Sequence, residues 1–316
     1  MRIVFLGTPD FAVPSLAAIH ESEYTVVAVI TAADKPAGRG LQLKASPVKE
    51  YAVTHGIPVL QPLNLKDPVF LEELISYQPD IQIVVAFRML PESVWNLPPL
   101  GTWNLHASLL PQYRGAAPIN HAIINGEEFT GLSTFKLVHQ IDQGAVAMQE
   151  TINIGPDENA GELHDRMMVA GAGLLLKTLH AIEAKTIILA PQVTDPETVP
   201  KEAPKLNPEF CRINWERPVS EVHNHIRGLS PFPGASTTLC QKEQKLPLKI
   251  FKAGISEVDF PVKPVGSVHF VEKRHIYVCC GNGWLELLEL QVSGKKRLKI
   301  SEFAPGYRFS EFDFME

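Results

Sequence analysis

The sequence predicts an α/β protein with a mostly parallel sheet in its N-terminal part and a small all-β domain in its C-terminal part. Val- and Ile-rich runs alternate with helix-patterned segments through the first half, which is typical of strands buried between helices. Beyond the middle of the chain, several short strands separated by turns indicate a barrel or a sandwich. At 316 residues, the chain is long enough to bury two separate cores.

The N-terminal elements follow one another in a regular order. "RIVFLG" is a strand that ends at Gly7, and "PDFAVPSLAAIHES" after it has helical spacing. A second helix begins at Ser46 and Pro47, a good N-cap and first position, and ends at Gly56. The other predicted strands are "YTVVAVIT", "IPVLQP", "DIQIVVAF" and "WNLHAS", and the other helices are "DPVFLEELISYQ" and "GELHDRMMVAGAGLLLKTLHAIEA". Continuous apolar strands of this kind predict a sheet that helices cover on both faces.

A Pro-rich polar segment, "APQVTDPETVPKEAPKL", separates the two parts and is typical of a linker. We therefore predict domains at 1–188 and 207–316 with a linker at 189–206. The second domain opens with a helix in "INWERPVSEVHNHIRGL", followed by the strands "GASTTLC", "LKIFKAGI", "GSVHFV", "HIYVCC" and "WLELLELQV". The "HNH" letters lie in that helix without an acidic or Cys partner at ligand spacing, so no metal site is predicted.

Charge and cysteine usage restrict the class of protein. The net charge of −6 argues weakly against a nucleic-acid binder, but residues 1–205 carry 14 basic and 22 acidic side chains and residues 206–316 carry 15 and 13. The C-terminal part can therefore present a locally basic surface. The four cysteines show no CxxC pair, and adjacent Cys279 and Cys280 should point to opposite faces of a strand. We expect reduced, mostly buried thiols in a cytoplasmic protein that has no membrane-spanning segment. We also expect the protein to be a monomer.

The residues best suited to chemistry lie at strand ends. In open parallel sheets, ligands bind at the carboxyl ends of strands, which brings together the loops after Leu6, Val85 and His106. Asn104 and His106 share one face of their strand, so an amide and an imidazole can meet a carbonyl oxygen that becomes negative. Asp142 in "HQIDQGAV" is the nearest candidate carboxylate to orient the imidazole. The alternative is that the three residues only make turn contacts and caps.

Several motifs occur in an order that resembles a known family. They are "FLGTPDFA", "DKPAGRG", "SPVK", "NLHASLLPQYRGAAPI", "IDQG", "RINWERPVSEVHNHIRGLSPFPGA" and "GKKRL". Together they resemble the folate-dependent formyltransferase family and, within it, the branch that formylates initiator methionyl-tRNA for translation initiation. The resemblance covers nearly the whole chain. It implies a Rossmann-like catalytic domain and an OB-like C-terminal barrel that binds tRNA.

The resemblance also implies roles for individual residues. Asn104 and His106 would face the formyl carbon of 10-formyltetrahydrofolate, and Asp142 would be coupled to His106 or to a bound water. The implied folate-binding residues are Phe87, Arg88, Leu90, Ser108, Leu109, Leu110 and Pro111, and the implied tRNA-binding residues are Lys35, Arg39, Lys295, Lys296 and Arg297. Arg114 is either a structural ion-pair partner, which we favour, or a substrate contact.

The chemistry of formyl transfer matches these side chains. A formyl group that passes from one nitrogen to another goes through a tetrahedral carbon that carries an oxyanion. One imidazole, one amide donor and one carboxylate can stabilise this oxyanion and move the protons of the reaction without a metal or a covalent intermediate. Two alternatives stay open at this point. One is the same reaction on a nucleotide-sugar or glycinamide ribonucleotide amine, and the other is a folate- or RNA-binding module without catalysis.

Overall fold

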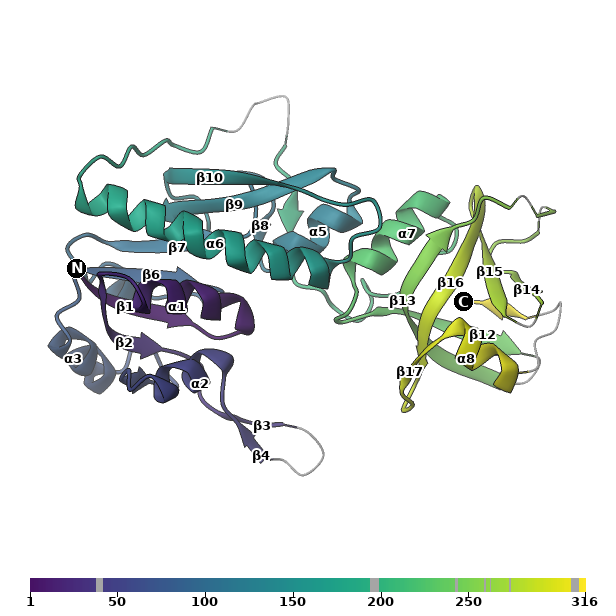
Figure 1. The fold of residues 1–316 in the computed structure, drawn as a ribbon, viewed down its shortest axis with the longest axis horizontal. Helices are drawn as coiled ribbons and strands as arrows, with labels where there is room; N and C mark the ends of the chain where they lie inside the picture. The colour runs from purple at the N-terminus through teal and green to yellow at the C-terminus, as the bar shows by residue number, and fades with distance from the viewer. Residues whose placement is uncertain are drawn as a thin grey trace. The chain divides into compact units, whose positions relative to one another are not determined.

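The computed structural model describes residues 1–37, 42–193, 199–241, 244–258, 260–261, 263–272, 274–307 and 313–316. The chain divides into two compact units, shown in Figure 1. The first comprises Met1–Gly115, Gly131–Ile152 and His164–Glu202, and the second comprises Ala116–Thr130, Asn153–Leu163 and Ala203–Glu316. The second unit thus takes in two stretches, Ala116–Thr130 and Asn153–Leu163, that precede the predicted linker.

The first unit is built on a seven-stranded sheet in the order β10-β9-β7-β6-β1-β2-β5. β5, β2, β1, β6 and β7 are parallel neighbours, whereas β9 is antiparallel to β7. The predicted mostly parallel sheet is confirmed, and β9 and β10 are strands that the sequence analysis did not identify. The bounds are β1 Arg2–Gly7, β2 Thr25–Ile30, β5 Val59–Leu60, β6 Ile81–Val85, β7 Thr102–His106, β9 Phe129–Lys136 and β10 Val146–Asn153.

Helices cover both faces of this sheet. Phe70 and Leu74 of α3 pack with Val4 and Leu6 of β1 on one face. On the other face, Gly171 of α6 meets Leu105 of β7 so closely that an added Cβ would lie 2.7 Å from Leu105 Cδ2. The helices are α1 Val13–His20, α2 Pro47–Thr54, α3 Pro68–Ser76, α4 Glu92–Trp95 and α6 Ala160–Glu183, with a 3₁₀ turn at Asp10–Ala12. In the described ranges, no helix combines the length and the apolarity that a bilayer crossing requires.

Helix starts follow the capping residues that the sequence offers. Ser46 precedes α2 and accepts a hydrogen bond from Lys49 N at 3.1 Å, and Asp67 precedes α3 and accepts from Val69 N at 3.0 Å. In each helix a Pro occupies the first position, where the missing N–H costs nothing. The side-chain caps and the prolines together fix where α2 and α3 begin.

The second unit is an antiparallel sheet that nearly closes into a barrel, as the OB-like prediction requires. Its strand order is β14-β15-β16-β13-β12-β18, and β17 pairs with β16. Ser267 next to β14 bridges Phe314 of β18, which brings the two edges together. The strands are β12 Ala235–Gln241, β13 Gln244–Ile255, β14 Val268–Val271, β15 His275–Cys280, β16 Gly283–Val292, β17 Arg297–Lys299 and β18 Phe314–Met315. The second unit also contains the helices α5 Pro118–Ile124, α7 Val219–Gly228 and α8 Ile300–Phe303 and a 3₁₀ turn at Ala304–Gly306. The short strands not yet named are β3 Lys35–Ala37, β4 Gln42–Lys44 and β8 Arg114–Gly115 of the first unit, and β11 Glu202–Ala203, which pairs with β8.

The adjacent cysteines of β15 show how the barrel wall is built. Cys280 belongs to the barrel core, whereas Cys279 packs with Tyr277 and Trp284 in a separate apolar cluster. The predicted opposite orientation of the two side chains is therefore confirmed. Both thiols are free and buried, and burial raises the pKa of Cys280 to about 12.

The "HNH" histidines lie in α7, which is shorter than predicted because it begins only after Pro218. Burial lowers the pKa of His225 to about 4 and also lowers the pKa of His223. A folded-state pKa below the unfolded value means that the unfolded chain takes up the proton first as the pH falls. The stability that neutral His225 provides is therefore present above about pH 6.5 and is lost as the pH falls toward 4.

We expect the free energy of unfolding to fall by about 2 kcal/mol between pH 7 and pH 5 through His225 alone. Denaturant titrations at the two pH values measure this change. The variant His225→Leu lacks the titrating ring and should lose correspondingly less stability over the same interval. An equal pH dependence in the parent and the variant would contradict the assignment.

Candidate active site

The carboxyl ends of three parallel strands lie side by side. β6 is between β1 and β7, in parallel register with both, so the strand ends at Gly7, Val85 and His106 share one edge of the sheet. This is the edge at which ligands bind in open α/β sheets. The structure thus brings together the three loops that the sequence analysis singled out.

Asn104 lies in β7 opposite Val84 of β6, on the sheet face that α3 and α4 cover. Its side chain is partly exposed, and among the described residues its amide has no hydrogen-bond partner. An amide that is reachable and unpartnered within the fold is available to donate to a ligand oxygen. Asn104 therefore has the properties of an oxyanion donor.

His106, the last residue of β7, is held by one backbone group. Its Nε2 lies 2.9 Å from the carbonyl oxygen of Tyr113, and only 7% of the residue is exposed. A carbonyl oxygen only accepts, so Nε2 carries the hydrogen and donates it. In the neutral ring the lone pair is then on Nδ1, which is left as the atom that can gain or lose a proton.

Asp142 approaches the same short segment from the loop between β9 and β10. Gly115 N donates to Asp142 Oδ2 at 3.1 Å, two residues along the chain from the Tyr113 carbonyl that binds His106. The imidazole and the carboxylate therefore converge on one stretch of backbone, without a direct hydrogen bond between the two side chains. Their catalytic coupling, directly or through a water, stays a prediction.

Three non-glycine residues in the loops at this edge have left-handed backbone conformations. They are Ala86 after β6 with φ 49°, Tyr113 with φ 58° and Asp142 with φ 53°. Each such conformation costs about 1–3 kcal/mol unless the surroundings compensate. Strain of this kind gathers at functional sites, which supports placing the site at these loops.

The segment Ser108–Pro111 is fastened to the sheet by a serine that the sequence analysis missed. The hydroxyl of Ser133 in β9 donates to Ser108 O at 2.6 Å and accepts from Leu110 N at 3.0 Å. Ser133 is fully buried, and Leu110 packs in a core cluster with Phe135 and Val146. The side chains of this segment that remain partly exposed are Leu109 and Pro111. Ser133 could not be found beforehand because its strand was not predicted.

The loop after β6 carries the other predicted folate residues. Phe87 and Leu90 are partly buried and pack against the core cluster of α3 and α4. The guanidinium of Arg88 donates to the carbonyl oxygens of Pro62 and Leu63 and lies 5.9 Å from the Phe87 ring centre. Arg88 therefore ties this loop to the segment that follows β5. Whether it also contacts folate stays a prediction.

Lys35, one of the predicted tRNA-binding residues, is the first residue of β3 in the hairpin β3–β4. Lys35 and Lys44 pair directly across it, although like charges in that position destabilise a hairpin. Lys49 instead forms an ion pair with Asp34 at 2.5 Å, and Gln61 also binds Asp34. Arg39 lies outside the described residues. A like-charged pair at the base of a hairpin is better tolerated when a polyanion binds it.

In the second unit, Lys295 and Lys296 are exposed in the turn between β16 and β17. Arg297 stacks over Phe251, with 4.4 Å from the guanidinium carbon to the ring centre, and pairs with Glu289. A groove of about 480 Å³ lies beside the turn and has Arg212 and Lys249 among its lining residues. Its other lining residues are Ser236, Thr237, Thr238, Pro247, Leu248, Gln291, Ser293 and Gly294.

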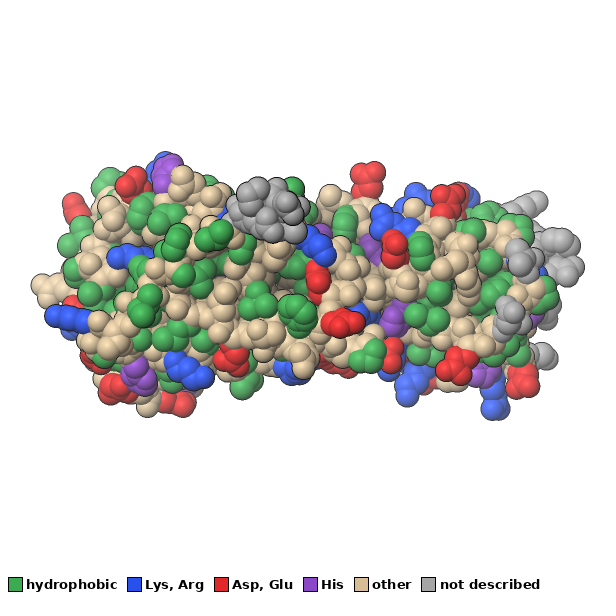
Figure 2. All heavy atoms as spheres, turned by 90° about the horizontal axis from the view of Figure 1, so that it is seen from above, with side chains coloured by type: hydrophobic (Ala, Val, Ile, Leu, Met, Phe, Trp, Pro, Cys, Tyr) green, Lys and Arg blue, Asp and Glu red, His purple; other side chains and the backbone are tan. Residues whose placement is uncertain are grey.

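Basic and acidic side chains are interspersed on the face that Figure 2 shows, among the residues that it colours. The side chains coloured on that face therefore form no single broad basic patch.

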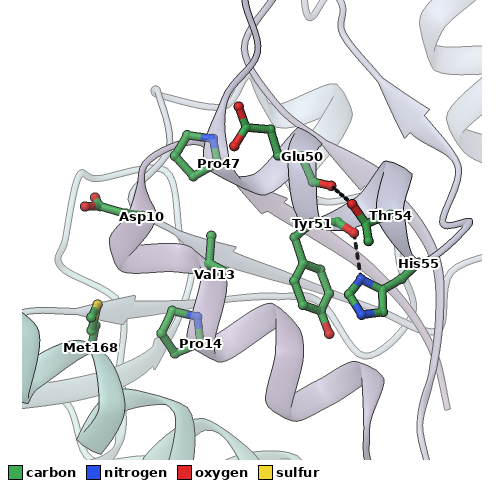
Figure 3. Close-up of a pocket in the computed structure, with 9 residues that line it drawn as sticks. All are labelled: Asp10, Val13, Pro14, Pro47, Glu50, Tyr51, Thr54, His55 and Met168. Atoms are coloured by element: carbon green, nitrogen blue, oxygen red, sulfur yellow. Dashed lines mark hydrogen bonds between the residues drawn. The ribbon is translucent and has the colours of Figure 1, made fainter.

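A larger cavity, of about 540 Å³, lies elsewhere on the first unit. It is lined by Asp10 of the first 3₁₀ turn, Val13 and Pro14 of α1, Met168 of α6 and five residues of α2 and its end, as Figure 3 shows. Its lining is largely apolar and does not include Asn104, His106 or Asp142. We therefore place the chemistry at the strand ends and not in this cavity.

Comparison with known proteins matches both parts of the chain to family models. Residues 1–179 match the model described as formyl transferase, and residues 205–308 match the formyl transferase C-terminal domain. The methionyl-tRNA formyltransferase of Flavobacterium johnsoniae is 49% identical over 311 residues, covering 98% of each chain. That of Bacteroides thetaiotaomicron is 48% identical over 317 residues, covering 98% of this chain and 97% of the relative.

Solved structures share the fold. An N-formyltransferase from Helicobacter canadensis, crystallised with folinic acid and dTDP-3-aminofucose, superposes with a TM-score of 0.65 at 20% identity. The match covers 94% of this chain and 99% of that one. At this level of identity, the comparison shows a common architecture.

Proposed function

Because the chain belongs to the methionyl-tRNA formyltransferase family, we propose that it transfers the formyl group of 10-formyltetrahydrofolate to the α-amino group of methionine on initiator tRNA. Two observations in the structure support this proposal. Asn104 and His106 lie on the same face of β7 at the edge of the parallel sheet, and His106 and Asp142 bind backbone groups that are two residues apart. Binding alone would not need an amide donor, an imidazole and a carboxylate at one edge of the sheet.

The three side chains have separate tasks in this reaction. The neutral amine attacks the formyl carbon, and the carbonyl oxygen becomes an oxyanion that the Asn104 amide stabilises. The C–N bond to folate then breaks, the folate nitrogen gains a proton, and the former amine loses one. His106 moves protons through Nδ1 and stabilises the developing charge, and Asp142 orients His106 and accepts the proton. One oxyanion donor is typically worth about 3 kcal/mol of barrier.

This assignment provides a binding surface for each of the two substrates. Leu109, Pro111 and the loop with Phe87 and Leu90 supply apolar surface for the folate ring system. Lys35 of the hairpin β3–β4 and the barrel turn with Lys295, Lys296 and Arg297 would hold the tRNA phosphates, together with Arg39, which lies outside the described residues. We propose that catalysis resides in residues 1–188 and tRNA binding in 207–316. We further propose a cytoplasmic monomer, for which light scattering of the purified protein is the test.

Formylation of charged initiator tRNA tests the proposed function directly. The purified chain, with 10-formyltetrahydrofolate as donor, should produce formylmethionyl-tRNA over many turnovers. A parallel reaction with a nucleotide-linked amino sugar or glycinamide ribonucleotide should give no comparable product. A folded protein that formylates the small amines and not the tRNA would overturn the proposal.

Removing Lys295 and Lys296 together should weaken tRNA binding most at low salt. Each lost phosphate contact reduces the slope of log K against log salt by about one, so we expect a change of about two. Filter binding of charged tRNA between low and physiological salt measures the slope. Lys66→Ala, which removes an exposed lysine from the first unit, is the control and should leave the slope unchanged. An unchanged slope in the double variant would exclude the two lysines from the tRNA path.

A further inference from the structure

The side chain of Gln192 joins three separate pieces of the first unit. Its Oε1 accepts from Arg114 Nε at 3.0 Å and from Arg114 Nη2 at 2.6 Å. Its Nε2 donates to Asp142 O and to Gly144 O, each at 2.8 Å. One amide thus connects a guanidinium to the backbone on both sides of the turn that presents Asp142.

This arrangement fixes both the orientation and the type of side chain. A guanidinium only donates and carbonyl oxygens only accept, so the amide oxygen must face Arg114 and the amide nitrogen must face the turn. Rotating the amide by 180° would break all four contacts. A glutamate could keep the bond to Arg114 but would place an oxygen against two carbonyl oxygens. An amide is therefore needed at this position, and Gln192 has the required length.

The turn itself depends on outside support. Asp142 has φ 53°, a conformation that is strained for a residue with a Cβ. Gly144 packs so tightly that an added Cβ would collide with Lys136 O. Ala190 pairs with Val146 in an isolated bridge and thereby brings Gln192 alongside the start of β10. The segment that the sequence analysis assigned to a linker thus reaches the candidate active site.

We propose that Gln192 is a positioning residue that, together with Arg114, holds residues 142–144 (the Asp142 turn) in the geometry that catalysis needs. This inference rests on the proposed role of Asp142. Arg114 and Gly115 then act as one anchor: Gly115 N binds the Asp142 carboxylate, and Arg114 binds the Asp142 backbone through Gln192. A displacement of about 1 Å in a catalytic group can reduce turnover about 100-fold.

Two variants separate the parts of this contact. Gln192→Glu keeps the acceptor for Arg114 but loses both donated bonds, whereas Gln192→Met loses all four at similar size. We expect both to lower kcat about 10- to 100-fold while the KM values for folate donor and tRNA stay within about threefold. Gln140→Glu makes the same chemical change at an exposed neighbouring residue and should retain the parent kcat.

Hydrogen exchange supplies a readout that does not depend on activity. Backbone amides of residues 140–146 and 113–115 should exchange faster in both variants, while the sheet strands β1 and β6 stay as protected as in the parent. Parent-like kcat in Gln192→Glu would overturn the role of the donated bonds. A fall in kcat without faster exchange in the turn, or with faster exchange throughout the unit, would overturn positioning. If the parent itself does not formylate tRNA, the proposed function fails instead.

Discussion

The variant His106→Ala should lower kcat for formylation by about 100- to 10,000-fold, the range typical of losing general acid–base help. The ring stands at the end of β7 with Nε2 bonded to Tyr113 O, so its proton-exchanging atom is fixed in direction. Alanine leaves no group that could move a proton there. Single-turnover kinetics with saturating folate donor and charged tRNA measure the change in the chemical step.

The second unit offers a matched control for this variant. His121 is similarly buried, with 6% exposed, and its Nε2 lies 3.0 Å from the Pro204 carbonyl oxygen. His121→Ala removes the same kind of ring and the same kind of hydrogen bond, so it should cost similar stability. It should leave kcat of the folded protein within a few-fold of the parent. Equal losses of activity in the two variants would mean that His106 is structural.

Much of the fold could be predicted because local signals and tertiary structure agree. Ser46 and Asp67 cap α2 and α3 as their sequences indicate, and the Val- and Ile-rich runs became the parallel strands. β9 and β10 were missed because "FTGLSTFK" and "VAMQETIN" mix polar and apolar residues without a clear period. Their strand conformation is imposed by pairing at the edge of the sheet. β18 has only two residues and likewise exists through its partners.

The candidate site also contains some residues that could be predicted from the sequence and some contacts that could not. Asn104 and His106 could be placed on one face because side chains alternate along a strand, and Asp142 was found through its motif. No local pattern predicts that Gln192, in a Pro-rich segment, would meet the Asp142 turn, because that contact depends on the Ala190 bridge to β10. Likewise, the contacts of Arg88 with the segment after β5 join residues 25 or 26 positions apart. Contacts between distant segments follow from the assembled fold.

The variant Asn104→Ala should lower kcat about 100- to 1,000-fold, the usual effect of removing one oxyanion donor. Its effect on stability should be small, because within the described chain the Asn104 amide has no hydrogen bond to lose. Asn120 is the opposite case, since its Nδ2 donates to Gly228 O at 2.8 Å. Asn120→Ala should cost about 1 kcal/mol in the free energy of unfolding and leave kcat near that of the parent.

The nearly isosteric variant Asn104→Asp distinguishes a donor from a residue that merely fills space. A carboxylate has almost the same shape as the amide but presents an oxygen, and usually a negative charge, to the developing oxyanion. It should therefore be at least as inactive as Asn104→Ala in the single-turnover assay at neutral pH. If Asn104→Asp instead retained most of the activity, the amide hydrogen would not be stabilising the transition state. The stabilisation of the oxyanion would then have to be assigned to His106 alone.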